Sequence, residues 1–420
     1  MIGFDEALAI IRREAQQLPM QVQHCAPSQA LGRVLAEAVV AGEDLPPFDN
    51  SAMDGFALYA AASGVHAGSE FDVAGAQAAG DTQVRGTPGA WEIMTGARMP
   101  EGMDAVVPVE QVEVLSTDSE QRPQRIRLNA DVGQGQNVRR CGEDVRLGRY
   151  VLAAGTLVEA QQLMLLAALG VQTVAVARRP RVAIISTGRE LVDDPAQALA
   201  SGEIRNSNGP FLAARVHAAG AELVLRETVG DDPAAFIAAL DRALAAGAEI
   251  VVSTGAVSMG RFDFVPDALR SIGARIHFHK VRIRPGKPLL LATLAGGQLY
   301  FGLPGNPVSS AVGLRFFVEP ALRVLLGMAP ETPLRARLAD AFDKRTGLHF
   351  MLKGRLEVDG SGQLQARILA GQESFRMTPL LAANAWIMVP ETMAAPVAGN
   401  LVEIHGLGHL QAPMVGEVLE

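Results

Sequence analysis

Residues 221–255 read AELVLRETVGDDPAAFIAALDRALAAGAEIVVSTG, and this stretch decides the fold of the centre of the chain. Its first ten and last eight residues are rich in aliphatic side chains and end in glycine, which is typical of buried strands. Between them, Asp231, Asp232 and Pro233 suit the first turn of a helix, and Gly247 suits its end. The stretch therefore predicts a strand, a helix and a second strand in succession.

The same alternation continues on both sides. Before the stretch, the pattern predicts a buried strand over residues 181–188 (RVAIISTG) and a helix over 209–219 capped by Asn208. After it, the pattern predicts a helix over 263–273, a strand over 274–283, a hairpin around Gly296 and Gly297, and a helix over 306–327 with Pro307 near its first turn. Strands that alternate with helices predict a central three-layer α/β/α domain with a mostly parallel sheet, which we place at residues 179–327.

The flanking regions differ in texture from the centre. Residues 49–146 are rich in short, glycine- and proline-punctuated strand patterns, which predict an inserted β-rich domain. Residues 328–420 return to strand patterns and predict a C-terminal β-barrel-like domain. Residues 1–48, with a helix over 4–17, and residues 147–178 are expected to form a discontinuous N-terminal helical and linker domain. The fold class is thus multi-domain α/β and β, as the chain length of 420 residues also suggests.

Composition excludes several classes of protein. The formal charge of −8 disfavours a nucleic-acid partner, because phosphate neutralisation needs a basic face. The most apolar stretch, residues 163–177, is too short and too mixed to span a bilayer, and the N-terminus has no basic signal region. Cys25 and Cys141 form neither a CxxC pair nor a zinc-like spacing. We expect a cytoplasmic protein with free thiols and no membrane partner.

Polar and small residues follow each strand of the predicted sheet. Glu190, Asp231 and Asp263 come after three of them, and LPGNPVSS (303–310) opens the last helix. Ligands bind at this rim of open α/β sheets, and the set suits a phosphate and a hard metal ion. Each residue alone also has a structural interpretation: Asp231, Asp232 and Asp263 can cap helices, Glu190 can be a solvated acid, and PGNP can be a simple turn.

Although the chain is acidic overall, basic residues cluster in one segment, residues 280–287. Lys280, Arg282 and Arg284 would share one face of the predicted strand, and Lys287 follows. This predicts a local anion site, although a charged edge strand is the alternative. His277 and His279 lie nearby, but they have no third ligand in view and do not predict zinc.

Seven motifs together resemble one family. They are PPFDNSAMDGFA (46–57), IMTGARMPEGMDAVVPVE (93–110), NVRRCGEDV (137–145), AIISTGREL (183–191), VVSTGAVSMGRFDF (251–264), VRIRPGKP (281–288) and GLPGNPVSS (302–310). Their order and spacing resemble the molybdopterin molybdenumtransferases and the related E domain of gephyrin, over essentially the whole chain. SAMDG and GLPGNPVS are the most specific of them.

The resemblance implies molybdenum-cofactor biosynthesis. Such an enzyme binds adenylylated molybdopterin and molybdate, inserts the metal and releases AMP with Mg²⁺ as cofactor. It also implies an elongated four-domain homodimer, whose cleft lies between the second domain of one subunit and the third and fourth of the other. Transient contact with other molybdenum-cofactor enzymes is a further implied partnership.

Site residues follow from matching the motifs position by position. The implied catalytic acids are Asp54, Asp144, Glu190, Asp231 and Asp263, with Glu190 and Asp231 as metal ligands. The implied contacts to the pterin substrate are Thr95, Arg139, Lys280, Pro304 and Pro307. The implied molybdate pocket comprises Arg284, Lys287, Ser309, Lys353 and Ser374.

The chain departs from the family pattern at four positions. Arg284 stands where lysine is usual, and Lys353 stands where arginine is usual, which keeps charge but changes geometry. Ala256 replaces a glycine, and Arg98 replaces a common proline. These departures bear on how the substrate is positioned.

Two other functions agree with parts of the pattern. A non-catalytic pterin-binding scaffold would not need five acids. A related molybdopterin adenylyltransferase would not need a separate cation pocket. The acids and the cations together therefore favour the metal-inserting enzyme.

Overall fold

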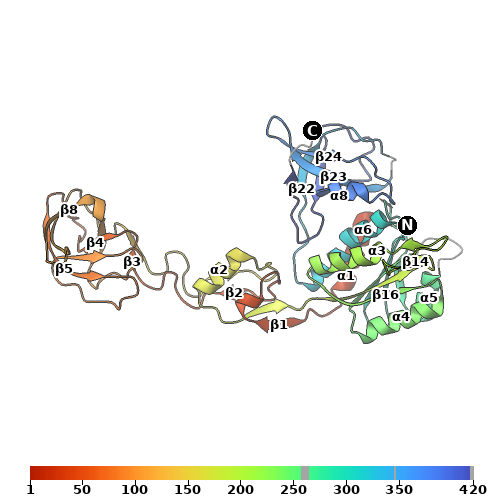
Figure 1. Ribbon diagram of the computed structural model, residues 1–420, viewed down its shortest axis with the longest axis horizontal. Coiled ribbons are helices and arrows are strands. Elements are labelled where there is room, and N and C mark those ends of the chain that lie inside the picture. The colour runs from red at the N-terminus through yellow and green to blue at the C-terminus, as the bar shows by residue number, and fades with distance from the viewer. Residues whose placement is uncertain (257–263, 345–346, 417–420) are drawn as a thin grey trace.

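The protein is elongated, and a computed structural model describes residues 1–256, 264–344 and 347–416. A β-rich lobe lies at one end, a thin middle region joins it to an α/β domain, and a second β domain stands beside the α/β domain (Figure 1). The expected fold class is confirmed: a central α/β domain, an inserted β-rich domain and a C-terminal barrel.

The α/β domain is built on a six-stranded sheet in the order β16-β13-β17-β21-β20-β18. Its first four strands run parallel, whereas β20 and β21 form the predicted hairpin and β18 is antiparallel to β20. The strands are β13 (Arg181–Thr187), β16 (Glu222–Val229), β17 (Ile250–Thr254), β18 (Arg275–Phe278), β20 (Leu290–Thr293) and β21 (Leu299–Leu303). The sheet is therefore mostly parallel, as the sequence predicts.

Helices cover both faces of this sheet. Alternate residues of β13 enter different cores, Val182 with the helix α3 and Ala183 with the helix α4, because side chains along a strand alternate between faces. One face carries α1 (Phe4–Ala15), α3 (Asn208–Ala218), α6 (Pro307–Gly313), a π-helical turn (Leu314–Val318) and α7 (Glu319–Leu325); the other carries α4 (Pro233–Ala245) and α5 (Val265–Ser271). This is the three-layer arrangement.

The first helix corrects one expectation. Phe4, Ala7 and Ile11 of α1 are buried in the same core as Phe317 and Leu322, so α1 belongs to the α/β domain and not with residues 147–178. The apolar stripe of α1 indicates that it is buried, but a stripe does not identify the surface that buries it.

The middle region joins chain segments far apart in sequence. Strand β1 (Val22–Cys25) pairs with β12 (Val174–Ala177), and β2 (Val39–Val40) pairs with β11 (Tyr150–Leu152). A 3₁₀ turn (Pro27–Gln29) and α2 (Ala160–Ala168) complete it. Glu159 and Gln162 form a capping box at the start of α2. The exact boundaries of the expected domains remain a prediction.

The β-rich domain has its own sheet, in the order β7-β4-β6-β5-β9-β8, and its own core around Phe56, Val107 and Ile126. The short strands β3 and β10 pair at its base. The elements are β3 (Asn50–Ser51), β4 (Gly55–Leu58), β5 (Glu70–Gln77), β6 (Ala90–Ile93), β7 (Ala105–Pro108), a 3₁₀ turn (Val109–Gln111), β8 (Val112–Thr117), β9 (Pro123–Leu128) and β10 (Val138–Arg139).

The C-terminal domain is a closed barrel in the order β23-β24-β22-β26-β25, because β25 also pairs with β23. Closure removes the exposed sheet edges. The elements are β22 (Leu334–Leu338), β23 (His349–Val358), β24 (Leu364–Ile368), α8 (Thr378–Ala382), β25 (Ala385–Val389), β26 (Leu401–His405) and β27 (Val415–Gly416). Strand β19 (Ile283–Arg284) reaches from the α/β domain to pair with β23.

Among the described residues, the structure holds no helix with both the length and the hydropathy that crossing a bilayer requires.

The remaining regular elements are β14 (Leu191–Val192) and β15 (Ile204–Arg205), which pair with each other beside the sheet.

Candidate functional site

A cleft of about 770 Å³ opens at the carboxyl ends of β13, β17 and β21. Four of the predicted site residues line it: Glu190, Asp231, Pro304 and Pro307. Asp231 follows β16, and Pro304 and Pro307 follow β21, so the rim of the sheet brings together residues from distant parts of the chain.

The two acids of the cleft flank one turn. Gly188 has a φ of 150°, and a methyl group there would lie 2.8 Å from both carboxylate oxygens of Glu190, so glycine leaves room for that carboxylate. The Arg189 amide donates to Asp231 Oδ2 at 3.4 Å. Glu190 and Asp231 are thus placed beside the same backbone turn.

The helix after β16 is capped by the neighbouring acid. Asp232 accepts hydrogen bonds from the amides of Ala234 and Ala235 at 3.2 and 3.1 Å, which is the N-cap geometry. Asp231 has no part in that cap. The alternative in which Asp231 is a capping residue is therefore wrong.

A partly buried polar network lies at the cleft. Asn208 Nδ2 donates to the Gly305 carbonyl at 2.7 Å and to Thr254 Oγ1 at 3.0 Å, and Thr254 Oγ1 lies 3.1 Å from Ser310 Oγ. The expectation that Asn208 caps the following helix is wrong, because its side chain ties two strand ends together. Asn206 does the capping instead, as its Oδ1 accepts from the Gly209 amide at 2.9 Å.

The implied molybdate residues gather beside this cleft. A methyl group at Gly286 would lie 3.5 Å from the Ser309 carbonyl, which places the turn bearing Arg284 and Lys287 against Ser309. The Val308 amide donates to the Ser374 carbonyl at 3.0 Å. Arg284 and Lys287 are exposed, and the Arg284 guanidinium lies 5.5 Å from the centre of the Phe350 ring.

Lys353 differs from the other members of this group. Its side chain is fully buried, and Nζ donates to the carbonyls of Gly371, Arg376 and Glu373 at 2.6, 3.0 and 3.4 Å. Burial lowers the pKa of this ammonium, and the charge of Glu373 opposes that effect. Lys353 therefore lies behind the cluster and faces a loop.

The expected strand over residues 274–283 is corrected. Strand β18 ends at Phe278, and β19 belongs to the barrel sheet, so Lys280, Arg282 and Arg284 do not share a strand face. Arg282 pairs with Glu391 at 3.1 Å. The predicted cation group is divided between two places, and Lys280 does not line the cleft.

Four other implied residues lie at the far end of the molecule, in and near the β-rich domain. The Thr95 amide donates to Asp54 Oδ1 at 2.6 Å, and this hydrogen bond lowers the pKa of the exposed Asp54 carboxyl. Arg139 on β10 pairs with Asn50 on β3, and exposed Asp144 donates its amide to the Leu45 carbonyl. None of these four residues lines the cleft of its own chain, and the β-rich domain lies at the opposite end of the molecule from the α/β domain (Figure 1).

The positions of the implied acids show which of them could hold a metal ion together. Asp263, the fifth implied acid, lies outside the described residues. Within the ranges that the structure describes, His, Cys, Asp and Glu nowhere form a group of three or more that could hold a metal ion. Glu190 and Asp231 supply two carboxylates, the number with which proteins often bind Mg²⁺ together with substrate phosphates and water.

Sequence reasoning missed several residues of the cleft wall. Asn206, Asn208, Phe375 and Met377 all line it. The rim rule could have found the two asparagines, since they follow the short strand β15. No local pattern marks Phe375 and Met377, which come from the C-terminal domain.

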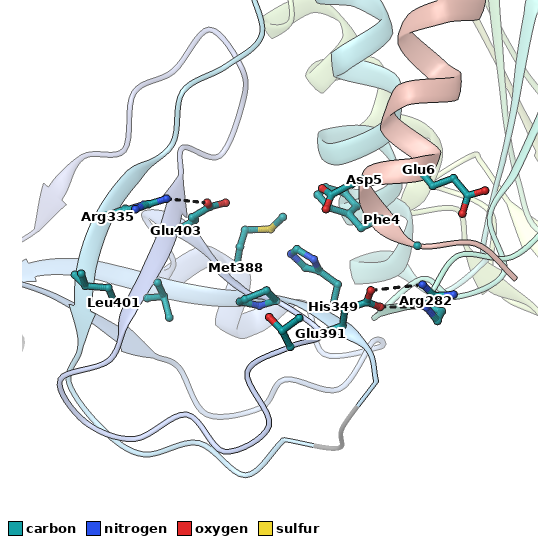
Figure 2. A pocket seen from close by; sticks show the side chains of 14 residues that line it. Phe4, Asp5, Glu6, Arg282, Arg335, His349, Met388, Glu391, Leu401 and Glu403 are labelled. Carbon is teal, nitrogen blue, oxygen red and sulfur yellow. Dashed lines mark hydrogen bonds and ion pairs between the residues drawn. The ribbon is translucent and has the colours of Figure 1, made fainter.

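A second cavity, of about 620 Å³, lies where the start of α1 meets the barrel (Figure 2). Ion pairs Arg282–Glu391 and Arg335–Glu403 lie at its edges, and His349 points inward beside Phe4 and Met388 (Figure 2). None of the implied site residues lines this cavity. The first cleft is therefore the candidate active site.

Comparisons with known proteins cover nearly the whole chain. Three family models match: the MoeA N-terminal region (domain I and II) at residues 2–170, the probable molybdopterin binding domain at 183–324, and the MoeA C-terminal region (domain IV) at 335–407. The chain is 36% identical to a molybdopterin molybdenumtransferase of Synechococcus elongatus, over 97% of this chain and 100% of the relative. It is 33% identical to that of Staphylococcus aureus strain Mu50, over 94% of both chains.

The architecture also has a solved counterpart. The molybdopterin biosynthesis moeA protein from Pyrococcus horikoshii superimposes with a TM-score of 0.80 at 29% identity, over 96% of this chain and 99% of that one. The similarity thus extends across all the parts of the molecule.

Proposed function

The chain belongs to the molybdopterin molybdenumtransferase family, and on that premise we propose that it binds adenylylated molybdopterin and molybdate, inserts the molybdenum and releases AMP. It is an enzyme of molybdenum cofactor biosynthesis that inserts molybdenum into molybdopterin.

One observation carries the proposal. A cleft with two carboxylates and an exposed cation group lie side by side and share one element, α6, whose Pro307 lines the cleft and whose Ser309 lies against the turn with Arg284 and Lys287. Molybdate is an oxyanion that needs cations and hydroxyls, whereas a metal-bound phosphoanhydride needs carboxylates. The two reactants can therefore be bound next to each other.

The cleft residues act by binding and orienting. Glu190 and Asp231 would hold Mg²⁺, which would neutralise charge on the adenylyl phosphoanhydride. Pro304 and Pro307 would contact the pterin and phosphate, as would Lys280. Arg284, Lys287, Ser309 and Ser374 would desolvate and orient molybdate, so that the pterin sulfurs meet it. Asp263 is proposed as a further acid of this site.

The remaining residues require a second subunit. Asp54, Thr95, Arg139 and Asp144 do not line the cleft of their own chain, and the β-rich domain lies at the other end of the molecule (Figure 1). We propose a homodimer in which they complete the cleft of the partner. An oligomer of this kind has two equal sites, each built from both chains.

We also propose a cytoplasmic setting and transient protein partners. Cys25 and Cys141 are free, which agrees with a reducing cytoplasm. Transient contact with other molybdenum-cofactor enzymes would deliver the substrate and collect the product.

The direct test is a reconstituted reaction. The full chain is incubated with adenylylated molybdopterin, Mg²⁺ and molybdate, and AMP release is followed together with metal content of the pterin. We expect AMP and metallated pterin in equal amounts, both abolished without molybdate. Turnover to AMP with no metal insertion would support an adenylyl-hydrolysing enzyme and overturn the proposal.

A further inference from the structure

One loop of the C-terminal domain forms part of the cleft wall. Residues 371–377 have no regular secondary structure, and they run from the end of β24 to α8. Phe375 and Met377 of this loop line the cleft, and the Ser374 carbonyl accepts from the Val308 amide on α6. The position of the loop therefore shapes both the cleft and the neighbouring oxyanion group.

A single buried ammonium holds this loop. Lys353 is on β23, in the middle of the barrel, and its side chain is 0% exposed. The carbonyls of Gly371, Glu373 and Arg376 all converge on its Nζ. Three carbonyl oxygens that point at one another repel, so the observed loop conformation depends on a cation among them.

An uncharged side chain fastens the same loop to the same strand residue. Gln372 Oε1 accepts from the Lys353 amide at 3.0 Å. Gln372 Nε2 donates to the Lys353 carbonyl at 2.8 Å and to the Leu369 carbonyl at 2.7 Å. The side chain of Lys353 and the side chain of the loop residue Gln372 thus both fasten the loop to β23.

The donors of Lys353 are fully engaged. An ammonium has three N–H donors, and three carbonyls accept from this one. An oxyanion bound at Nζ would have to replace at least one of these hydrogen bonds and loosen the loop. The geometry therefore separates Lys353 from the exposed Arg284 and Lys287.

We propose that Lys353 is a positioning residue, which fastens residues 371–377 to β23 and so places Ser374, Phe375 and Met377 at the active cleft, and that it does not bind molybdate. Its catalytic consequence rests on the proposed function, whereas its effect on the loop does not.

The first measurement is hydrogen exchange in the substrate-free protein, which requires no catalytic activity. The variant Lys353→Met keeps the length of the stem and removes the donors. We expect amides of residues 371–377 to exchange at least roughly tenfold faster, because the loop opens locally, while the strands of the α/β sheet exchange as in the wild type. Unchanged exchange of the loop would overturn the proposal.

The second measurement separates loop positioning from charge. Gln372→Leu removes the other fastening and no charge, and it also serves if Lys353→Met fails to fold. We expect both variants to lower kcat/KM for AMP release by roughly tenfold or more, because small misplacements at a site are costly. We also expect both to raise the KM for the pterin substrate as well as that for molybdate, since Phe375 and Met377 of the loop line the cleft and Ser374 belongs to the neighbouring oxyanion group.

A matched control guards against general destabilisation. Asn384, between α8 and β25, is also joined to β23, through hydrogen bonds with the Leu356 amide and carbonyl at 2.7 and 3.0 Å. Unlike Phe375 and Met377, Asn384 does not line the cleft. Asn384→Ala should leave loop exchange and kinetics near wild type. A higher molybdate KM alone in Lys353→Met, with Gln372→Leu normal, would identify Lys353 as a direct ligand and refute the proposal. A wild-type enzyme without AMP release would refute the proposed function and leave the exchange result standing.

Discussion

Asp231 and Asp232 are neighbours in the chain with different tasks. Asp232 caps α4, whereas Asp231 faces the cleft beside Glu190. We expect Asp232→Ala to lower the free energy of unfolding by about 1 kcal/mol, as for a lost N-cap, with little loss of activity. We expect Asp231→Asn to reduce AMP release by orders of magnitude with almost unchanged melting. Chemical denaturation and the AMP assay on both variants measure this, and the reverse pattern would contradict the assignment.

Ala256 carries backbone strain at the mouth of the cleft. Its φ is 46°, in the left-handed region, where a Cβ costs about 1–2 kcal/mol. Replacing Ala256 by glycine would relieve this strain, but glycine loses more conformational entropy on folding than alanine does. The net effect of Ala256→Gly should therefore be a rise of about 0.5–1 kcal/mol in the free energy of unfolding.

The same substitution in a helix gives the control for Ala256. Ala238 is exposed in the interior of α4, so Ala238→Gly should lower the free energy of unfolding by about 1 kcal/mol. Denaturant titration of both variants should therefore give changes of opposite sign. A loss of stability in both would show that the conformation at residue 256 imposes no strain.

At the scale of elements, a buried ionic group joins the C-terminal segment to the α/β domain. Glu319 of α7 is fully buried and accepts from Arg215 of α3 and from the His409 amide. His409 Nε2 lies 3.0 Å from the Ala219 carbonyl, and the guanidinium of Arg323 is also close. The group fixes how residues 405–411 rest on the helices.

This joint predicts a pH dependence. Burial first, then the charges of Arg323 and Arg315, lower the pKa of His409 to about 3, although the hydrogen bond to the Ala219 carbonyl and the charge of Glu331 oppose them. An unfolded chain takes up this proton near pH 6.5, so the contribution to stability is present above pH 6.5 and is lost as the pH falls towards 3. The loss from this one residue is about 2 kcal/mol at pH 5.

The variant His409→Gln cannot titrate. Its fall in unfolding free energy between pH 7.5 and pH 5 should therefore be smaller than that of the wild type by about 2 kcal/mol. His217 is exposed on α3, and His217→Gln should keep the wild-type slope. Equal slopes in all three proteins would mean that His409 is not held neutral by burial.

At the scale of the whole molecule, the elongated shape separates the two groups of implied site residues. The β-rich lobe with Asp54 and Thr95 and the α/β domain with Glu190 and Asp231 lie at opposite ends (Figure 1). A dimer that exchanges these ends would complete both sites. Light scattering should then give about twice the mass of 44.3 kDa, and a monomer at micromolar concentration would contradict the shared site.

Subunit mixing tests the shared site directly. Asp54→Asn and Asp231→Asn homodimers should each be inactive. In a mixed dimer one site has both lesions and the other has none, so an equal mixture should recover about a quarter of wild-type activity. Two wild-type chains mixed in the same way serve as the control for subunit exchange. No recovery after verified exchange would place both acids within one chain's site, or remove one of them from the reaction.

Local pattern was sufficient for much of this molecule. Residues 181–188 and 221–255 specify strands and a helix because continuous aliphatic runs that end in glycine are typical of buried strands, and because the capping residues mark the ends of the helix. Glu190, Asp231, Pro304 and Pro307 could be assigned to one rim, because the carboxyl ends of parallel strands meet there. The sequence by itself thus determined the fold class and one wall of the site.

Only the tertiary structure decided the partners of particular side chains. The stripe of α1 indicated burial, but its neighbours Phe317 and Leu322 lie some 300 residues away in the chain. A motif placed Lys353 with the oxyanion residues, yet its ammonium is engaged by three carbonyls of a folded loop. Periodicity and capping act between near neighbours in sequence, whereas hydrogen-bond partners and buried charges depend on which distant segments pack together.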